Sequence, residues 1–153
     1  MAGSTPQLAH VFDFYVEVGT PTDIGPIGRG RRRSVPIVGG TFEGSGMSGV
    51  ILGGADHQIV RDDEVVEIEA RYTLRVTTGA LIGVQSAGIR HAPPAAMKRL
   101  LAGEAVDPSQ VYFRTAITFE TSASDLAWLM RSIFLGVGER HPHAVLMRVW
   151  QVE

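Results

Sequence analysis

The sequence predicts an all-β protein, a barrel or a sandwich, and two features indicate this class. Short stretches of alternating apolar and polar residues follow one another at close, fairly even spacing. Such alternation is the pattern of a strand with one buried face. The 18 glycines are dispersed and separate these stretches, as turns, bulges and barrel corners require. We expect about eight strands.

The first predicted strand, HVFDFYVEV at residues 10–18, shows the pattern most clearly. Phe12, Phe14 and Val16 share one face, while Asp13 and Glu17 lie on the other. The same reasoning predicts the remaining strands at residues 35–44, 49–54, 57–61, 65–76, 80–89, 111–121 and 144–152.

Two helices are predicted between the strands. Residues 92–103 begin near two prolines and end at Gly103, which is the usual punctuation of a helix. Residues 122–136 place a set of apolar side chains at helical spacing and carry Asp125 near the start. This apolar set is Leu126, Leu129, Met130, Ile133 and Phe134. We expect both helices to cover the wall or one end of the sheet.

The composition limits the class of protein. Residues 1–153 fit one domain, with no linker or repeat. The chain has no cysteine, which excludes disulfides and thiolate metal sites. Its 14 basic and 16 acidic residues argue against nucleic-acid binding. No apolar run spans a membrane, and the N-terminus lacks the basic start of a signal peptide, so we expect a cytoplasmic protein.

Three motifs suggest chemistry. The run RGRRR, residues 29–33, can bind phosphate or carboxylate, although such runs more often form solvated loops. GSGMSG, residues 44–49, matches a nucleotide-binding pattern, but a strand-like stretch follows it instead of a helix, which favours a glycine-rich hairpin. His141 and His143 provide only two of the three ligands that a catalytic zinc site needs, so no metal site is expected.

The strands at 65–76 and 111–121 each have one apolar face and one face of charged and hydroxyl side chains. If the polar faces point outward, these are ordinary solvated positions. If part of them points inward, a barrel would contain a polar-lined pocket. The periodicity leaves both arrangements open.

Asp56 and His57 stand side by side in the stretch GGADHQIVRDD. Adjacent strand residues point to opposite faces, so one of the two can face the interior and act in proton transfer. Alternatively, Asp56 caps a turn after Gly53 and Gly54, and His57 is exposed.

Five blocks of sequence occur in an order that resembles the DUF3237 family, also called UPF0311. They are RRSVPIVGGTFEG, GVILGGADHQIVR, ARYTLRVTTGALIGVQSAGIR, YFRTAITFET and the pattern W-L…F-x-G-x-G-E-R at residues 128–140. The resemblance covers residues 8–152 and implies one antiparallel β-barrel domain, similar in kind to allene-oxide-cyclase and dirigent-type barrels. Such barrels hold small organic ligands in the lumen and act without a metal or redox cofactor.

The resemblance also implies a set of recurring positions, all matched here: Arg32, Arg33, Asp56, Arg71, Tyr72, Arg90, Arg114, Glu120 and Trp128. Three positions depart from the family pattern. His57 replaces a tryptophan, Thr78 stands where an acid is usual, and Met130 replaces an asparagine.

These observations lead to a hypothesis of a cofactor-independent enzyme. It would bind a small, largely apolar carbonyl or phenol compound in the lumen and catalyse isomerisation, cyclisation, hydration or elimination by proton transfer. The expected catalytic residues are Asp56, His57 and Tyr72, and the expected substrate-binding residues are Arg33, Arg71, Arg90, Arg114, Glu120 and Trp128. Two alternatives remain: a non-catalytic carrier or sensor, and an interaction module that forms a homodimer through an apolar edge strand.

Overall fold

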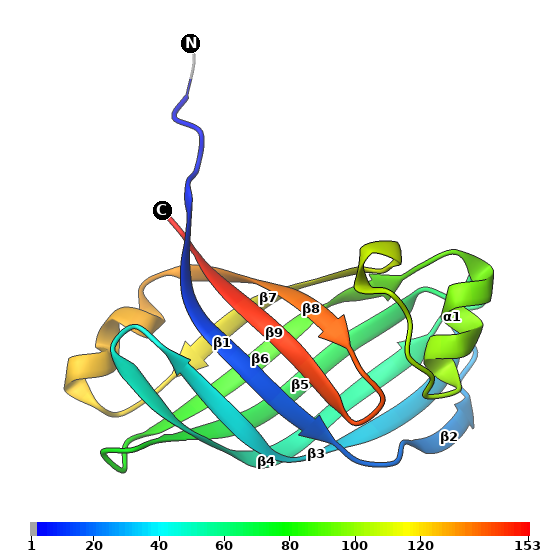
Figure 1. Ribbon diagram of the computed structural model, residues 1–153, viewed down its shortest axis with the longest axis horizontal. Coiled ribbons are helices and arrows are strands. Elements are labelled where there is room, and N and C mark those ends of the chain that lie inside the picture. Colours follow the sequence, from blue (N-terminus) through cyan, green and yellow to red (C-terminus); the bar gives the residue numbers. More distant parts are fainter. Residues whose placement is uncertain (1–2) are drawn as a thin grey trace.

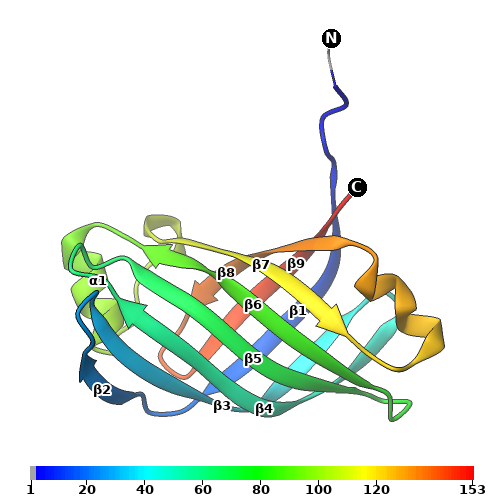
Figure 2. The same ribbon diagram turned by 180° about the vertical axis from the view of Figure 1, so that it is seen from behind.

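The computed structural model describes residues 3–153 and consists of a closed antiparallel barrel (Figures 1 and 2). Eight strands form the wall: β1 (Leu8–Val18), β3 (Arg31–Gly44), β4 (Met47–Val60), β5 (Val66–Val76), β6 (Leu81–His91), β7 (Tyr112–Glu120), β8 (Ile133–Arg140) and β9 (Ala144–Val152). The expected all-β fold with about eight strands is confirmed.

The barrel closes through the first strand. β1 pairs with β9 on one side and with β3 on the other, and every other wall strand pairs with its neighbours in the chain. All of these pairings are antiparallel. A short additional strand, β2 (Thr22–Pro26), pairs with the start of β3. Closure leaves the wall without a free edge, because each strand has partners on both sides.

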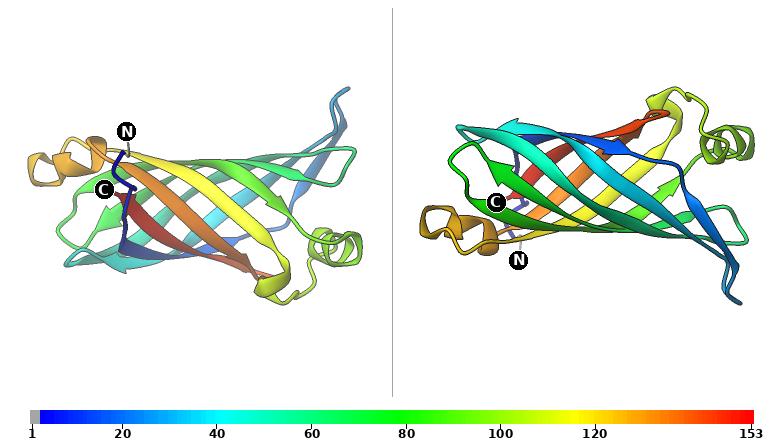
Figure 3. Two further views of the ribbon diagram at one scale, coloured as in Figure 1. Left: turned by 90° about the horizontal axis from the view of Figure 1, so that it is seen from above. Right: turned by 90° about the horizontal axis from the view of Figure 1, so that it is seen from below.

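The two ends of the barrel carry different elements (Figure 3). Helix α1 (Pro94–Leu101), the 3₁₀ turn η1 (Pro108–Gln110) and β2 lie at one end. The 3₁₀ helix η2 (Ser124–Met130) lies at the opposite end. The α1 helix falls inside the predicted range 92–103 and buries Ala96, Met97 and Leu100.

Alternation along each strand sends one set of side chains into the lumen. On β1 these are Phe12, Phe14 and Val16, and on β5 every second residue from Val66 to Val76 is buried. The polar faces of β5 and β7 point outward, since their alternate residues are exposed or partly exposed. The first of the two arrangements left open by the sequence is therefore the correct one for these strands.

The prediction of a helix over residues 122–136 is wrong in its second half. The helical part is a single 3₁₀ segment, η2, and β8 begins at Ile133. The alternating residues Phe134, Gly136 and Gly138 fit a strand, and β8 completes the wall between β7 and β9. Closing the barrel requires this strand, and tertiary pairing therefore overrides a helical spacing of apolar residues.

Two further strand predictions are refined. The separate strands expected at 49–54 and 57–61 form one continuous strand, β4. The glycine-rich hairpin is confirmed: Gly44 and Gly46 flank Ser45 in the β3–β4 turn, and all three have positive φ. No helix in residues 3–153 has the length and hydropathy to cross a membrane.

Candidate functional site

Polar side chains gather inside the barrel at the end that carries α1. Asp56 and Gln58 come from β4, Ser86 and Arg90 from β6, and Arg140 from β8. Arg33 of β3 pairs in register with Gln58, so it lies on the same inner face. Gln58, Ser86 and Arg90 are only 3%, 2% and 3% exposed. We call Arg33, Arg90 and Arg140 the inner arginines.

Asp56 is held by two hydrogen bonds. The side chain of Gln58 donates to Oδ2 at 2.8 Å, and the backbone N–H of Glu69 donates to Oδ1 at 3.1 Å. Burial raises the pKa of the Asp56 carboxyl above its ordinary value, and the two hydrogen bonds and the charge of Arg90 offset only part of this rise. The result is a fixed carboxylate that accepts protons more readily than a solvated aspartate.

The backbone around Asp56 is shaped by this carboxylate. Asp56 pairs with Ala70 and Ile59 pairs with Glu67, but the two residues between them on each strand are not paired. The N–H of Glu69 is directed to the carboxylate. At this point of the β4–β5 ladder, the Asp56 side chain therefore provides the acceptor for a strand N–H.

Arg90 is the most deeply buried charge in the site. Its guanidinium lies 5.5 Å from the centre of the Phe113 ring, a cation–π arrangement. A Cβ at Gly138 would meet that ring at 2.7 Å, so glycine at this position leaves the space that Phe113 fills. Arg90 Nε has no hydrogen-bond partner. Burial and the nearby Arg140 lower the pKa of Arg90 to about 10, so it remains charged at neutral pH.

Arg33 and Arg140 line a cavity of about 700 Å³ at the mouth of the barrel. The remaining walls include Val18 of β1, Leu100 and Leu101 of α1, and His143 of the β8–β9 turn. Burial is the main cause that lowers the pKa of both arginines, and mutual repulsion contributes to the shift at Arg140. Arg31 and Asp23, which form an ion pair with each other, also line the cavity, which therefore combines apolar side chains with three arginines and one carboxylate.

A second, much smaller cavity of about 40 Å³ lies deeper in the lumen, next to Asp56. Tyr72, Ser86 and Phe113 contribute to its lining, and Val18 borders both cavities. Tyr72 is 6% exposed, and burial together with the charge of Asp56 raises its pKa. Tyr72 is therefore a neutral phenol that can donate a hydrogen bond inside the lumen.

The structure brings four of the residues expected from the sequence into this region: Asp56, Tyr72, Arg33 and Arg90. The others lie elsewhere. His57 is exposed on the outer face, where its Nδ1 is 3.5 Å from the hydroxyl of Ser34. It therefore does not face the lumen, and a change of residue type at this position alters the outer surface.

Arg71 and Glu120 lie on the outside of the barrel, where both line a surface cavity of about 350 Å³. Arg114 is also exposed, with its guanidinium 5.2 Å from the centre of the Tyr112 ring. Trp128 belongs to η2 at the opposite end and stacks on Phe12 with their ring centres 6.3 Å apart. These four residues do not contact the polar cluster around Asp56.

Three members of the inner cluster were missed by sequence reasoning: Gln58, Ser86 and Arg140. Ser86 and Arg140 occupy inward positions in phase with the buried apolar residues Val84 and Phe134, whereas Gln58 is in phase with Asp56 on β4. For Ser86 and Arg140, a polar residue that interrupts an apolar face was therefore the available signal. For Arg140 it was hidden by the helix predicted over the start of β8.

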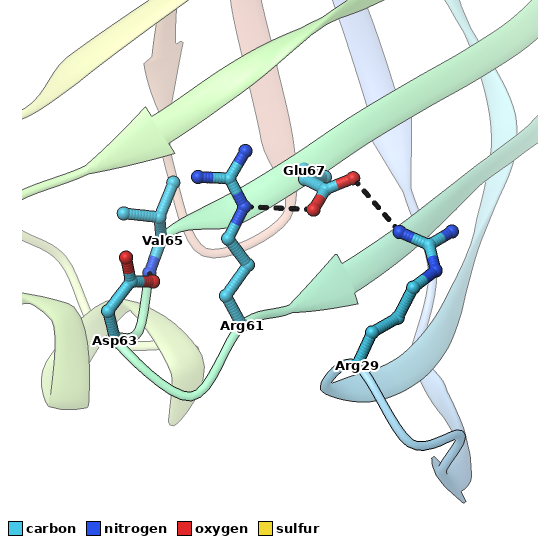
Figure 4. A network of polar contacts seen from close by, with 5 residues as sticks. All are labelled: Arg29, Arg61, Asp63, Val65 and Glu67. Atoms are coloured by element: carbon cyan, nitrogen blue, oxygen red, sulfur yellow. Dashed lines mark hydrogen bonds and ion pairs between the residues drawn. The ribbon is translucent and has the colours of Figure 1, made fainter.

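The outer rim of the same end is lined by paired charges. Glu67 accepts from Arg61 at 2.8 Å and from Arg29 at 3.4 Å, while Asp63 accepts from the backbone N–H of Val65 (Figure 4). Arg31 is paired with Asp23 at 2.7 Å. By contrast, no ion pair within residues 3–153 includes Asp56 or any inner arginine.

The two histidines of the HPH motif flank the β8–β9 turn. His141 lies 3.4 Å from Glu139, and His143 lines the mouth cavity. Within the described part of the chain, no three His, Asp or Glu side chains come together as a metal site.

Comparison with known proteins gives consistent matches over nearly the whole chain. The family model for DUF3237, described as a protein of unknown function, matches residues 6–152. A UPF0311 protein of Rhodopseudomonas palustris is 42% identical over 149 residues, which cover 97% of each chain. A UPF0311 protein of Clostridium acetobutylicum is 39% identical and covers 93% of this chain and 91% of its own.

Solved structures share the barrel. The crystal structure of a conserved protein of unknown function from Rhodopseudomonas palustris superposes with a TM-score of 0.93 at 39% identity, covering 99% of this chain and 100% of its own. An enzyme from Penicillium herquei has the same fold, with a TM-score of 0.75 at 18% identity, covering 100% of this chain and 98% of its own. The family match and the close relatives agree over the full barrel, and the chain belongs to the DUF3237 (UPF0311) family.

Proposed function

We propose that the protein is a cofactor-independent enzyme that catalyses proton transfer on a small, largely apolar molecule with a carbonyl or phenol group. Asp56 is the proposed base. The observation that carries the proposal is the Asp56 carboxylate itself: it is fixed by two hydrogen bonds, lines an interior cavity, and has a raised pKa. Raised basicity at a fixed position is what general base catalysis requires.

The two cavities suggest how such a molecule would be held. The body of the molecule occupies the larger cavity at the mouth, and only the reacting group enters the 40 Å³ space beside Asp56. Apolar side chains such as Val18 and Leu100 would contact the body. Holding the reacting atom next to a fixed base removes much of the entropic cost of the reaction.

In the proposed step Asp56 takes a proton from a carbon next to the carbonyl, or from a phenol oxygen. The electron pair of the broken bond is delocalised onto the substrate oxygen, which becomes negatively charged. Arg90 or the Tyr72 hydroxyl stabilises this oxyanion. Asp56 then returns the proton to another atom of the same molecule, which completes an isomerisation or cyclisation and regenerates the carboxylate. Addition or elimination of water would use the same proton movement.

The inward direction of Asp56 favours it over its neighbour as the base. Asp56 lines the inner cavity, whereas His57 is exposed on the other face of the same strand. A base must come within hydrogen-bond distance of the proton that it removes, and only Asp56 meets this condition for a ligand in the lumen. That the same fold occurs in a Penicillium herquei protein described as an enzyme supports an enzymatic role.

The test measures proton exchange directly. The purified protein is incubated in D₂O with a panel of small aryl ketones, β-dicarbonyl compounds and phenols, and NMR follows the loss of exchangeable C–H signals. We expect catalysed exchange with the wild type and a loss of about 10²–10⁴-fold with Asp56→Asn, which keeps the shape of the side chain but removes the base. His57→Asn, on the outer face of the same strand, is the matched control and should keep full exchange.

The result that would refute an enzymatic role is equally concrete. If compounds from the panel bind the wild type but none exchanges faster than in buffer, the barrel is a carrier or sensor. If exchange occurs and Asp56→Asn retains it, the base has been assigned to the wrong residue.

A further inference from the structure

Positive charge inside the lumen exceeds negative charge. The inner arginines bring three guanidinium groups to this end of the barrel, where Asp56 is the carboxylate of the lumen and Asp23, paired with Arg31, is the carboxylate of the mouth cavity. The inner arginines lie close enough to repel one another, and Arg90 is nearly inaccessible to water. Charge that is buried without a partner is costly, so a protein that retains it needs an additional anion at this position.

The rim of the same end shows that carboxylate partners are available in this part of the sequence. Arg29, Arg31 and Arg61 each have one, supplied by Glu67 or Asp23. Arg99 of α1 is likewise paired with Glu104 at 3.2 Å. Arg33 stands opposite Asp23 in the β2–β3 pairing, and the charge of Asp23 offsets part of the lowering of the Arg33 pKa by burial. Asp23 nevertheless makes its ion pair with Arg31, and none of the ion pairs in residues 3–153 includes Arg33. The neighbouring arginines, including Arg31 in the wall of the same cavity, are thus paired with carboxylates, whereas the inner arginines make no ion pair within the described part of the chain and can bind an anionic ligand.

An unpaired donor leads to the same conclusion. The N–H at Arg90 Nε is buried without a hydrogen-bond partner. At the mouth, Arg140 uses Nη1 for the backbone carbonyls of His141 and Ala144, which fixes its direction beside the cavity. A guanidinium that is held in place on one side can bind a carboxylate with its remaining N–H groups.

We infer that the substrate of the proposed reaction carries a carboxylate, which Arg33 and Arg140 bind at the mouth of the barrel. This inference rests on the proposed function, because it orients the same molecule. The carboxylate lies between the two arginines, the apolar body contacts Val18 and Leu100, and the reacting group points inward to Asp56. The substrate class is therefore a small apolar carboxylic acid with a carbonyl or phenol group.

The experiment compares two probes that differ only in charge. Phenylacetate and phenylacetamide have nearly the same size and the same apolar ring, but only the first is an anion. Isothermal titration calorimetry should give at least about tenfold tighter binding for phenylacetate, as expected for charge-assisted hydrogen bonds. Arg140→Gln and Arg33→Gln should each reduce this preference by about tenfold, and Arg140→Lys should lose less than Arg140→Gln.

Arg148→Gln is the matched control, because Arg148 is exposed on the outer face of β9. It should keep the preference for phenylacetate. Equal affinity for the two probes, or a preference that Arg140→Gln and Arg33→Gln leave unchanged, would overturn the inference. Tighter binding of inorganic phosphate than of phenylacetate would also overturn it, since the site would then be one for phosphate.

Two further measurements distinguish a folding defect, a failure of the anion site and a failure of the proposed function. The comparison of the two probes uses the wild type, so equal affinity overturns the inference even if an arginine variant does not fold, and the conservative Arg140→Lys variant tests the assignment to this site. Asp56→Asn should still prefer phenylacetate, because the base does not contact the carboxylate. If the protein prefers phenylacetate but proton exchange does not depend on Asp56, the proposed function fails and the anion site stands. If proton exchange depends on Asp56 but the preference for phenylacetate is absent, only the anion site fails.

Discussion

The two ends of the barrel contain side chains of opposite character. At the η2 end, Phe12, Phe119, Phe134 and Trp128 pack in edge-to-face, stacked and tilted pairs, with Phe119 and Phe134 ring centres 4.9 Å apart. At the α1 end, the lumen holds Asp56, Gln58, Ser86 and the inner arginines. The same alternation of strands produces both ends, and only the residue types differ.

The aromatic end stabilises the fold, and the polar end forms the candidate site. The aromatic end buries large apolar surface with favourable ring contacts. The polar end keeps three buried polar atoms without partners, Gln58 Oε1, Ser86 Oγ and Arg90 Nε. Each such atom typically costs about 1–3 kcal/mol. A cost of this kind concentrated at one end is typical of a binding or catalytic site.

The largest expected effect is at the aromatic end. Phe134 is 0% exposed, and its ring contacts Phe119 and Trp128. Phe134→Ala should lower the free energy of unfolding by about 3–5 kcal/mol, because it leaves a cavity among aromatic rings. Urea denaturation followed by fluorescence measures this loss. Phenylacetate binding, measured where the variant is still folded, should not change; a loss below about 1 kcal/mol would show that this end does not carry the stability assigned to it.

The second prediction is a gain in the free energy of unfolding at the polar end. Arg90→Met replaces a buried, incompletely bonded charge by an apolar side chain of similar length. Such replacements are often neutral or stabilising by about 1–4 kcal/mol, and we expect a gain of about 1–2 kcal/mol together with loss of proton exchange. Chemical denaturation and the D₂O assay test the two parts. A clear loss of stability would mean that Arg90 is structural and that its contact with Phe113 outweighs its desolvation.

The sequence alone predicts the apolar strand faces but not the position of every polar residue. Strand alternation was enough for an all-β fold and for the burial of Phe12, Phe14 and Val16, while the choice of a barrel over a sandwich came from the family resemblance. It could not decide between a helix and β8, because Leu126, Leu129 and Phe134 fit a helical period as well. Strand alternation also could not place Arg71 and Glu120. The face of a strand that points inward depends on its pairing with distant strands.

The third prediction concerns pH. The pKa of Asp56 is higher in the folded protein than the ordinary 3.8, so the folded state binds more protons than the unfolded state from about that pH upward to the raised value. Stability therefore falls as the pH rises through this window, by no more than about 1.4 kcal/mol per pH unit for one proton. Thermal melts of the wild type and Asp56→Asn across pH 3–8 should diverge, with the variant gaining relative stability as the pH rises.

The proposed activity should change in the opposite direction across the same window. Exchange by Asp56 requires the ionised carboxylate, so the rate should fall as the pH drops through its raised pKa. If the melting curves of the two proteins run parallel at all pH values, Asp56 has the same pKa folded and unfolded, and the argument from burial is wrong.

The smallest expected effect is at His57, the neighbour of Asp56. His57 follows Asp56 directly on β4 but is exposed, and its contact is with Ser34 on the outer face. His57→Ala should change the free energy of unfolding by no more than about 0.5 kcal/mol, as is usual for surface positions, and should leave both exchange and phenylacetate binding intact. Denaturation, NMR exchange and calorimetry on the same preparation check all three. A variant that folds normally but loses exchange would show that a ligand reaches the outer face of β4, and the lumen would then no longer be the proposed site.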